Sequence, residues 1–347
     1  MKHLFLLWVS ACVWAAEHNP SPVDSSPRAI DQNPVASRVS NFSISEVAGF
    51  VHISKCGGAS WLKELSGIFN TVSPRRHGVE GCYFWQRRKY PVDNFMVSLR
   101  SPRAHVWSQF TECVYSPWGM RQTIHTAFPR GGGEEQDFKT WLGSFLDMDR
   151  GFNTSSDRYK CYHPANYQAR ALTCDVKEPH DVVGSPPVYE PSFEHAKRSY
   201  HEFSWVGLND FFLESKCLLY YRIRGLAKAE DFIDRYCRCD DRAQGASKRK
   251  EKGVAHVVHH ANGHRDTTTM LDAVVLALID RLTRTDLRLF RMALDVFLKE
   301  VIVMENALGR RVLCDATLRA AEQELAYFTP NVTARYAAHR APGAHQY

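Results

Sequence analysis

The chain has 347 residues, of which 44% are hydrophobic and 24% are charged, and its formal net charge at neutral pH is +6. This composition is that of an ordinary globular protein, with one large or two ordinary domains and a sizeable core. The positive charge favours anionic partners. It is too small to indicate nucleic-acid binding by itself, and we expect no nucleic-acid partner.

The N-terminus has the pattern of a secretory signal. A basic start at Lys2 precedes an apolar run that ends at Ala16. A run of about a dozen apolar residues fits the core of a signal peptide and is short for a membrane span of about 20 residues. Small residues at Val13 and Ala15 fit a cleavage site. Residues 1–16 are therefore predicted to be a signal peptide or a short, uncleaved signal anchor, and only the anchor would attach the protein to a membrane.

Two further features agree with the secretory pathway. The sequence has N-glycosylation sequons at Asn41, Asn153 and Asn331, and ten cysteines, of which Cys12 lies in the signal segment. In an oxidising compartment some of the other nine should form disulfides, and their odd number leaves at least one free. The pairing stays open, and the spacings do not indicate zinc.

The elements predicted after the signal form an α/β pattern. Residues 17–46 are rich in Pro, Ser, Asn and Asp, which predicts a flexible stem. The main domain is expected at 47–308, with a partly disordered C-terminal extension at 309–347. Apolar runs predict strands at 50–53, 94–99 and 204–208, and helical spacing predicts helices at 59–69, 136–150, 210–221 and 271–306, the last with a break near 283–285. Strands separated by helices indicate a mainly parallel sheet.

A lysine and two glycines follow the first predicted strand. They are Lys55, Gly57 and Gly58, and a predicted helix begins directly after them. Unpaired N–H groups of a first helical turn bind phosphates, glycines let the backbone approach an anion, and a lysine adds charge. The alternative is a tight turn with a solvated lysine. Arg100 follows the second strand, so two cations at two strand ends would grip two phosphates of one ligand.

Five short blocks occur in order between residues 48 and 300: His52–Ser60, Leu99–Ser108, Asn166–Leu172, Val206–Phe211 and Asp286–Phe297. Together they resemble the Golgi carbohydrate sulfotransferases that use 3′-phosphoadenosine 5′-phosphosulfate (PAPS), especially the heparan sulfate 2-O and 6-O types. The resemblance implies a three-layer P-loop-like fold with a central, mainly parallel sheet. It is that of a divergent member, since Cys56 and Ala59 replace threonines of the family's Lys-Thr-Gly-Gly-Thr loop, and Ser101 replaces the acidic residue of its Leu-Arg-Asp-Pro segment.

The resemblance implies roles for the residues of the first two blocks. Lys55 would stabilise the bridging oxygen as negative charge builds on the departing nucleotide. Arg100 and Ser108 would hold the 3′-phosphate, and no metal is required. The 5′-phosphate would be held by the loop, through Cys56, Gly57, Gly58, Ala59 and Ser60. A thiolate would be favoured at Cys56, and we expect a free thiol that the product 3′-phosphoadenosine 5′-phosphate (PAP) protects from alkylation.

A sugar hydroxyl needs a general base, and its identity stays open. In the 2-O and 6-O types the base is a histidine between the two nucleotide blocks, and the histidine in that interval is His77. It is equally a surface histidine in a basic loop. Glu64 and Glu80 are rivals, because other sulfotransferases use a glutamate. Asn166 and Arg170 either face the substrate or cap a helix.

The predicted function is transfer of a sulfuryl group from PAPS to a hydroxyl of a glycan or proteoglycan acceptor, in the Golgi lumen or after secretion. Basic groups at 75–76, 87–89 and 248–250 suit an anionic polysaccharide, or are solvated faces. The alternative is a catalytically inactive, secreted glycan-binding protein of the same fold. A nucleotide kinase is disfavoured, because Lys55 precedes the glycines whereas the kinase motif places its lysine after them.

Overall fold

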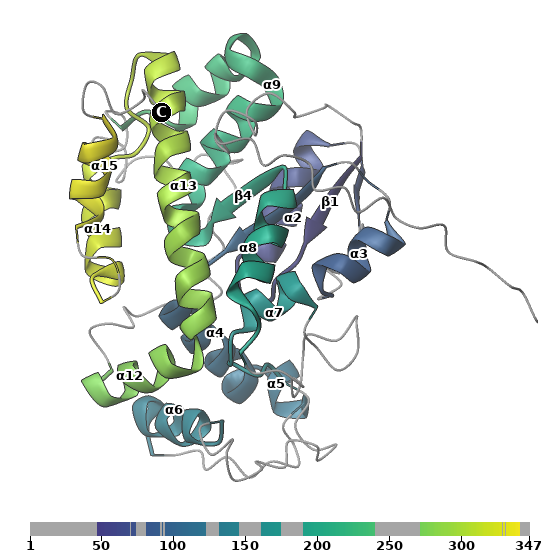
Figure 1. Ribbon diagram of the computed structural model, residues 1–347, viewed down its shortest axis with the longest axis vertical. Helices are drawn as coiled ribbons and strands as arrows, with labels where there is room; N and C mark the ends of the chain where they lie inside the picture. The colour runs from purple at the N-terminus through teal and green to yellow at the C-terminus, as the bar shows by residue number, and fades with distance from the viewer. Residues whose placement is uncertain are drawn as a thin grey trace, which may run out of the picture. The chain divides into compact units, whose positions relative to one another are not determined.

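The computed structural model contains a four-stranded sheet in which neighbouring strands are all parallel, in the order β2–β1–β3–β4 (Figure 1). The strands are β1 (Val47–Val51), β2 (Thr71–Ser73), β3 (Phe95–Leu99) and β4 (Trp205–Leu208). The structure describes residues 47–69, 71–73, 81–90, 92, 94–122, 132–145, 161–174, 190–239, 271–327, 329 and 331–340. The predicted parallel α/β arrangement is confirmed, with β2 as a strand that the sequence pattern did not indicate.

Helices make up most of the described chain, and several match the predicted ranges. Thr283 ends one helix and precedes the next, where a break was expected. The helices are α2 (Gly58–Ile68), α3 (Tyr83–Lys89), α4 (Pro102–Tyr115), α5 (Pro117–Gln122), α6 (Glu134–Gly143), α7 (Tyr167–Thr173), α8 (Phe193–Glu202), the 3-10 turn η2 (Asn209–Phe211), α9 (Phe212–Tyr236), α12 (Ala273–Leu282), α13 (Arg284–Leu308), α14 (Asp315–Leu325) and α15 (Val332–Arg340).

The sheet is buried on both faces, as a parallel sheet requires. Phe50, Met96 and Trp205 pack on one face, with Trp61 of α2 and Leu219 of α9. Successive strand residues point to opposite faces, so the neighbouring positions belong to the other side. Helices α8 and α13 cross that side in Figure 1. The larger cluster, which includes side chains of α4, α7 and α13, contains Val51, Val97, Leu99, Val206 and Leu208.

The helical segment α9 folds back on itself. Cys217 and Cys237 form a disulfide with their Cα atoms 6.1 Å apart, although 20 residues separate them. A straight helix of that length would place them about 30 Å apart. Tyr220 stacks on Phe232, with ring centroids 3.7 Å apart, so the two halves of the segment lie against each other.

Four disulfides and one free thiol account for the cysteines of the described ranges. The free cysteine is Cys56, and it is buried. The prediction that some cysteines pair and at least one stays free is confirmed, and disulfides of this number indicate an oxidising, secretory or extracellular compartment. The pairs are Cys82–Cys174, Cys113–Cys161, Cys217–Cys237 and Cys239–Cys314. Among the described helices, none is both long and apolar enough to cross a bilayer.

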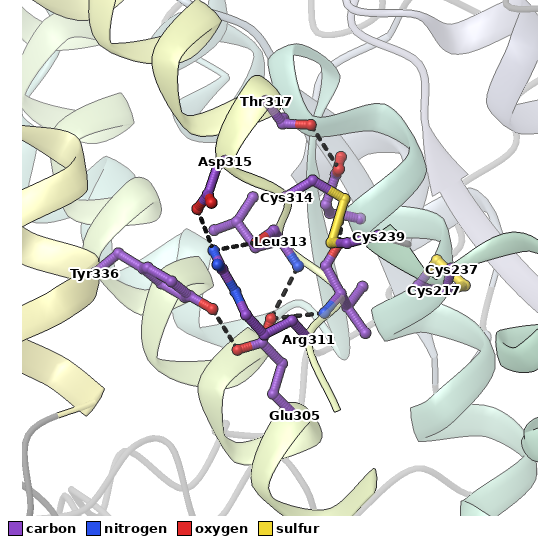
Figure 2. Close-up of a disulfide and its surroundings, with 12 residues drawn as sticks. Cys217, Cys237, Cys239, Glu305, Arg311, Leu313, Cys314, Asp315, Thr317 and Tyr336 are labelled. Carbon is purple, nitrogen blue, oxygen red and sulfur yellow. Dashed lines mark hydrogen bonds and ion pairs between the residues drawn. A yellow bond between two sulfur atoms is a disulfide. The ribbon is translucent and has the colours of Figure 1, made fainter. Parts of the chain in front are cut away.

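Helices α14 and α15 occupy the segment that the sequence assigned to a C-terminal extension. Buried Glu305 of α13 anchors this segment, because one carboxylate oxygen accepts the N–H groups of Val312 and Leu313 at 2.7 and 2.8 Å (Figure 2). The other oxygen accepts the hydroxyl of Tyr336 on α15. The disulfide from Cys314 reaches the end of α9 beside this cluster. The signal and stem predictions, residues 1–46, lie outside the described ranges.

Substitution Glu305→Ala should lower the free energy of unfolding by about 3 kcal/mol or more, because it leaves three donors without their acceptor in a buried place. Asp315→Ala is the matched control. Asp315 pairs with Arg311 in the same cluster, but its side chain is 65% exposed, so its loss should change the free energy of unfolding far less. Urea unfolding of both variants measures the difference. Equal losses would show that Glu305 does not anchor the C-terminal helices.

Candidate functional site

The turn between β1 and α2 has an unusual backbone. Lys55 has φ of 65° and Gly57 has φ of 78°, both in the left-handed region. A lysine adopts this conformation at a cost of about 1 kcal/mol or more, which its surroundings must offset. Alternation of backbone handedness turns successive N–H groups toward one side and forms an anion-binding concavity. The N–H of Cys56 donates to the carbonyl of Ile53 at 3.2 Å, so Lys55 is the third residue of a tight turn, and both interpretations of this segment stay open.

Both glycines of this turn are required by close contacts. A Cβ atom at Gly57 would lie 2.2 Å from Oδ1 of Asn209, in the turn after β4. A Cβ atom at Gly58 would lie 1.8 Å from the ring of His52. Gly57 is also the residue that precedes α2, and it has no side chain to cap that helix. The first-turn N–H groups of α2, which include Ala59 and Ser60, are thus available to an anion.

One face of α4 lies against this turn. His105 donates from Nε2 to the carbonyl of Ser54 at 2.8 Å, and Glu112 forms an ion pair with Lys55 at 2.8 Å. Ser108 lies between His105 and Glu112 on the helix, three residues after one and four before the other, so it shares their face. Burial lowers the pKa of His105 to about 3, so its imidazole is neutral. The Ser108 side chain is buried, and its predicted role stays a prediction.

Arg100 brings the turn after β3 into contact with the turn after β1. Its Nη1 donates to the carbonyl of Lys55 at 3.1 Å. Its own N–H and carbonyl are both bonded to the side-chain amide of Gln168, at 2.9 and 2.8 Å. In the strand order β2–β1–β3–β4, the chain changes direction across the sheet between β1 and β3. Lys55 and Arg100 thus meet at a topological switch point, the usual place for a ligand in such sheets.

Gln168 is held in place by reciprocal capping between α7 and α13, an exchange of caps in which a buried side chain from each segment accepts N–H groups at the start of the other helix. Asp286 accepts the N–H groups of Gln168 and Ala169, at 3.2 and 2.7 Å. Asn166 in turn accepts the N–H groups of Thr285 and Asp286, at 2.8 and 3.2 Å. Burial raises the pKa of Asp286 to about 7, although the two N–H donors oppose that rise. The third sequence block, Asn166–Leu172, therefore holds the Gln168 side chain where it binds the main chain of Arg100.

Asn166 and Arg170, for which the sequence left two interpretations open, bind backbone groups. Asn166 caps α13, as described above, and Arg170 donates to the carbonyls of Ala165 and His163, at 2.8 and 2.7 Å. Their exposed fractions are 3% and 1%. The capping interpretation holds for Asn166, and Arg170 fastens the segment that leads into α7.

Of the three candidates for a general base, Glu64 is the one that the structure describes. Glu64 is mostly buried and forms an ion pair with Lys216 at 2.6 Å, between α2 and α9. His77 and Glu80 lie outside the described residues, so their roles stay predictions. The basic groups at 75–76 and 248–250 lie outside them as well.

Two acidic residues from other elements contact Ser101, the residue that precedes α4, and the sequence analysis gave neither of them a role. Ser101 donates its N–H to Asp210 at 2.8 Å and its hydroxyl to Glu324 at 2.9 Å. The two carboxylates that Ser101 contacts thus come from η2 and from α14. Burial raises the pKa of Asp210. Glu324 is 223 residues from Ser101 along the chain, and no local pattern links two positions so far apart.

Arg103, on the first turn of α4, contacts both α12 and the C-terminal segment. Its guanidinium forms two hydrogen bonds with Asp280 of α12, at 2.8 and 2.5 Å. It also lies 3.4 Å from the ring centroid of Tyr327, just after α14. Arg103 is 7% exposed, so this cation is part of the structure and does not face a ligand.

Cys56 is a free thiol, as predicted, but the expected thiolate is wrong. Its side chain is 1% exposed and contacts Oε1 of Gln168 at 3.6 Å. Burial raises the pKa of the Cys56 thiol well above its usual value, and this outweighs the favourable charge of Arg100. The thiol is therefore a neutral part of the floor of the site.

The chain has no match among protein-family models, curated proteins or solved structures. In the ranges that the structure describes, no group of three or more His, Cys, Asp or Glu side chains is placed to hold a metal ion. Lys55, Arg100 and the first turn of α2 lie together after the ends of β1 and β3.

Alkylation of the native protein at neutral pH should leave Cys56 unlabelled, because the thiol is buried and protonated. Labelling should become complete in urea without reductant, when the disulfides stay intact and only this cysteine of the described ranges is free. Mass spectrometry of the peptide that contains Cys56 gives the result. Rapid labelling of the native protein would mean that the turn opens.

The substitution Asp286→Asn tests the buried cap through the pH dependence of the free energy of unfolding. The folded-state pKa of Asp286 is about 7 against an ordinary 3.8, so between these values the folded state keeps a proton that the unfolded state has lost. Stability from this group is therefore present below pH 4 and lost as pH rises toward 7, by at most about 1.4 kcal/mol per pH unit. Urea unfolding between pH 4.5 and 7 should show this slope in the wild type and a smaller one in the variant. Parallel curves would show that Asp286 is ionised throughout.

Proposed function

We propose that this protein is a carbohydrate sulfotransferase of the secretory pathway, acting in the Golgi lumen. It transfers the sulfuryl group of PAPS to a hydroxyl of a glycan. The observation that carries this proposal is the contact between the two turns that bear Lys55 and Arg100, where the guanidinium of Arg100 binds the carbonyl of Lys55. A ligand with two separate phosphate groups and one transferable group suits two cations whose turns are in contact.

We further propose that the fold is of the three-layer, P-loop-like kind. The parallel sheet, the turn after β1 that leads into a helix, and the placement of β3 beside β1 all support it. In this arrangement the first turn of α2 points its N–H groups at the 5′-phosphate, while Arg100 and Ser108 hold the 3′-phosphate. The N–H of Cys56 donates to the carbonyl of Ile53 at 3.2 Å, so Cys56 makes no phosphate contact in this proposal.

Sulfuryl transfer resembles phosphoryl transfer, in which positioning and charge stabilisation do most of the work. The reacting sulfur lies between the acceptor oxygen and the bridging oxygen of the nucleotide. The ammonium of Lys55 stabilises the charge that builds on the bridging oxygen as the bond to sulfur breaks. Its side chain is only 13% exposed, and a drier site strengthens that interaction.

The acceptor in this proposal is an anionic polysaccharide or proteoglycan. Arg88 and Lys89 are exposed on α3, and the ammonium of Lys89 lies 4.6 Å from the ring centroid of Trp85. Cations beside a part-exposed aromatic ring suit sulfated or carboxylated sugars, which offer both charge and an apolar ring face.

A second candidate is a secreted glycan-binding protein that has lost catalysis. The ion pair between Lys55 and Glu112 favours it, because the catalytic cation is already neutralised. Such a protein would keep its basic surface and would not respond to the nucleotide. Binding of PAP therefore separates the two candidates.

Millimolar PAP should raise the melting temperature, because a ligand that binds only the folded state stabilises it, and ATP should raise it less. Arg100→Ala should weaken PAP by about 2 kcal/mol, roughly thirtyfold, since a charged hydrogen-bonding partner is lost. Arg87→Ala is the matched control, because Arg87 is exposed and pairs with Glu202. Calorimetric titration measures each dissociation constant. Absence of any PAP shift in the wild type would contradict the proposed enzyme.

A further inference from the structure

Glu112 is the described carboxylate that contacts the proposed catalytic lysine. Its Oε2 lies 2.8 Å from Nζ of Lys55, and the two side chains are 25% and 13% exposed. Glu112 comes from α4, one turn beyond Ser108, so the helix that holds the 3′-phosphate also carries it. The sequence analysis gave it no role, because nothing in the local pattern relates positions 55 and 112.

The ion pair cannot persist unchanged when the nucleotide binds. A mostly buried ammonium requires a counter-charge, and Glu112 supplies it. The phosphosulfate brings negative oxygens to the same ammonium. Lys55 then has a better partner, whereas Glu112 faces a new anion of like charge. In the complex proposed above, the phosphosulfate therefore competes with Glu112 for the Lys55 ammonium, and the carboxylate lies beside the reacting group.

We propose that Glu112 is the catalytic base of the sulfuryl transfer. This inference rests on the proposed function. In the step, the Glu112 carboxylate accepts the proton of the acceptor hydroxyl, and the acceptor oxygen forms a bond to sulfur. The bond from sulfur to the bridging oxygen breaks, and its electron pair stays on the 5′-phosphate of PAP, next to Lys55. The products are the sulfated glycan, PAP and the protonated Glu112 carboxyl group, which returns its proton to water.

Other groups on the described part of the site are less suited to this task. Glu64 is held by Lys216 between α2 and α9 and is 9% exposed. His105 shares the face of α4 with Glu112, but it is 1% exposed and its Nε2 donates to the carbonyl of Ser54. Glu112 is a quarter exposed, so a sugar hydroxyl can reach it.

The exchange of partners gives Glu112→Gln an unusual combination of effects. PAP should bind to the variant more tightly, on the order of tenfold, because the competing carboxylate is gone. Turnover with PAPS and a panel of desulfated glycans should fall roughly hundredfold or more, the scale for loss of a general base. A residue that only supports the fold would weaken both. Calorimetry with PAP and a radiolabel transfer assay provide the two measurements.

Three further variants serve as controls for the Glu112→Gln measurements. Glu112→Asp retains a carboxylate and should recover part of the turnover, which also shows that position 112 tolerates substitution. Glu112→Ala should regain turnover when formate is added, because a small carboxylate then takes the place of the side chain. Glu190→Gln removes an exposed ion pair with Arg284 and should change neither PAP affinity nor turnover.

The outcomes distinguish this inference from the function on which it rests. A wild type that binds no PAP overturns the proposed sulfotransferase, and the role of Glu112 with it. If the wild type binds PAP and turns over, but Glu112→Gln keeps most of its turnover, only the role of Glu112 is overturned. His77→Ala, Glu64→Gln and Glu80→Gln then test the other candidates. Weaker PAP binding by Glu112→Gln also overturns it, since the ion pair would then be a support for the loop.

Discussion

A buried exchange of caps between α7 and α13 holds the candidate site in place. Asn166 satisfies the first N–H groups of α13, while Asp286 satisfies those of α7. Gln168, fixed by that exchange, binds both main-chain groups of Arg100, and Arg100 binds the carbonyl of Lys55. Each hydrogen bond in this series has a backbone group as one partner, so the series sets the positions of the turns themselves. A fully bonded polar network of this kind specifies one arrangement of its parts, because every alternative leaves a buried polar group unpaired.

Those parts of the fold that depend on neighbouring residues could be predicted from the sequence. The apolar runs before Lys55 and Arg100 are strands, and parallel strands end at one edge, so the meeting of the two cations follows from period and direction alone. The helix break at Thr283 also has a local origin. The odd count of cysteines predicted an unpaired one; Cys56 was named for it on the expectation of a thiolate, so the residue was right and the reason was wrong.

The remaining features depend on contacts between distant positions, which a single sequence does not reveal. Nothing near Glu112 indicates that it meets Lys55, and nothing near Ser101 indicates the carboxylate of Glu324. Charge neighbours were visible in the sequence around Cys56, but burial was not, and burial decided its protonation. The local sequence around a polar residue such as Asn166 is the same whether that residue caps a distant helix or faces a ligand. Only the three-dimensional structure separates the two.

The disulfide between Cys239 and Cys314 has a consequence for the integrity of the chain. It joins the end of α9 to the start of α14, on either side of residues 240–313. If a protease cut one peptide bond in that interval, the two polypeptides would stay covalently linked, and the piece with α14 would keep Glu324 next to Ser101. Cys82–Cys174 gives the same tolerance to cuts between those two cysteines. The protein can therefore exist as a nicked, two-chain form that only a reducing agent separates, a property suited to a compartment rich in proteases and poor in thiols.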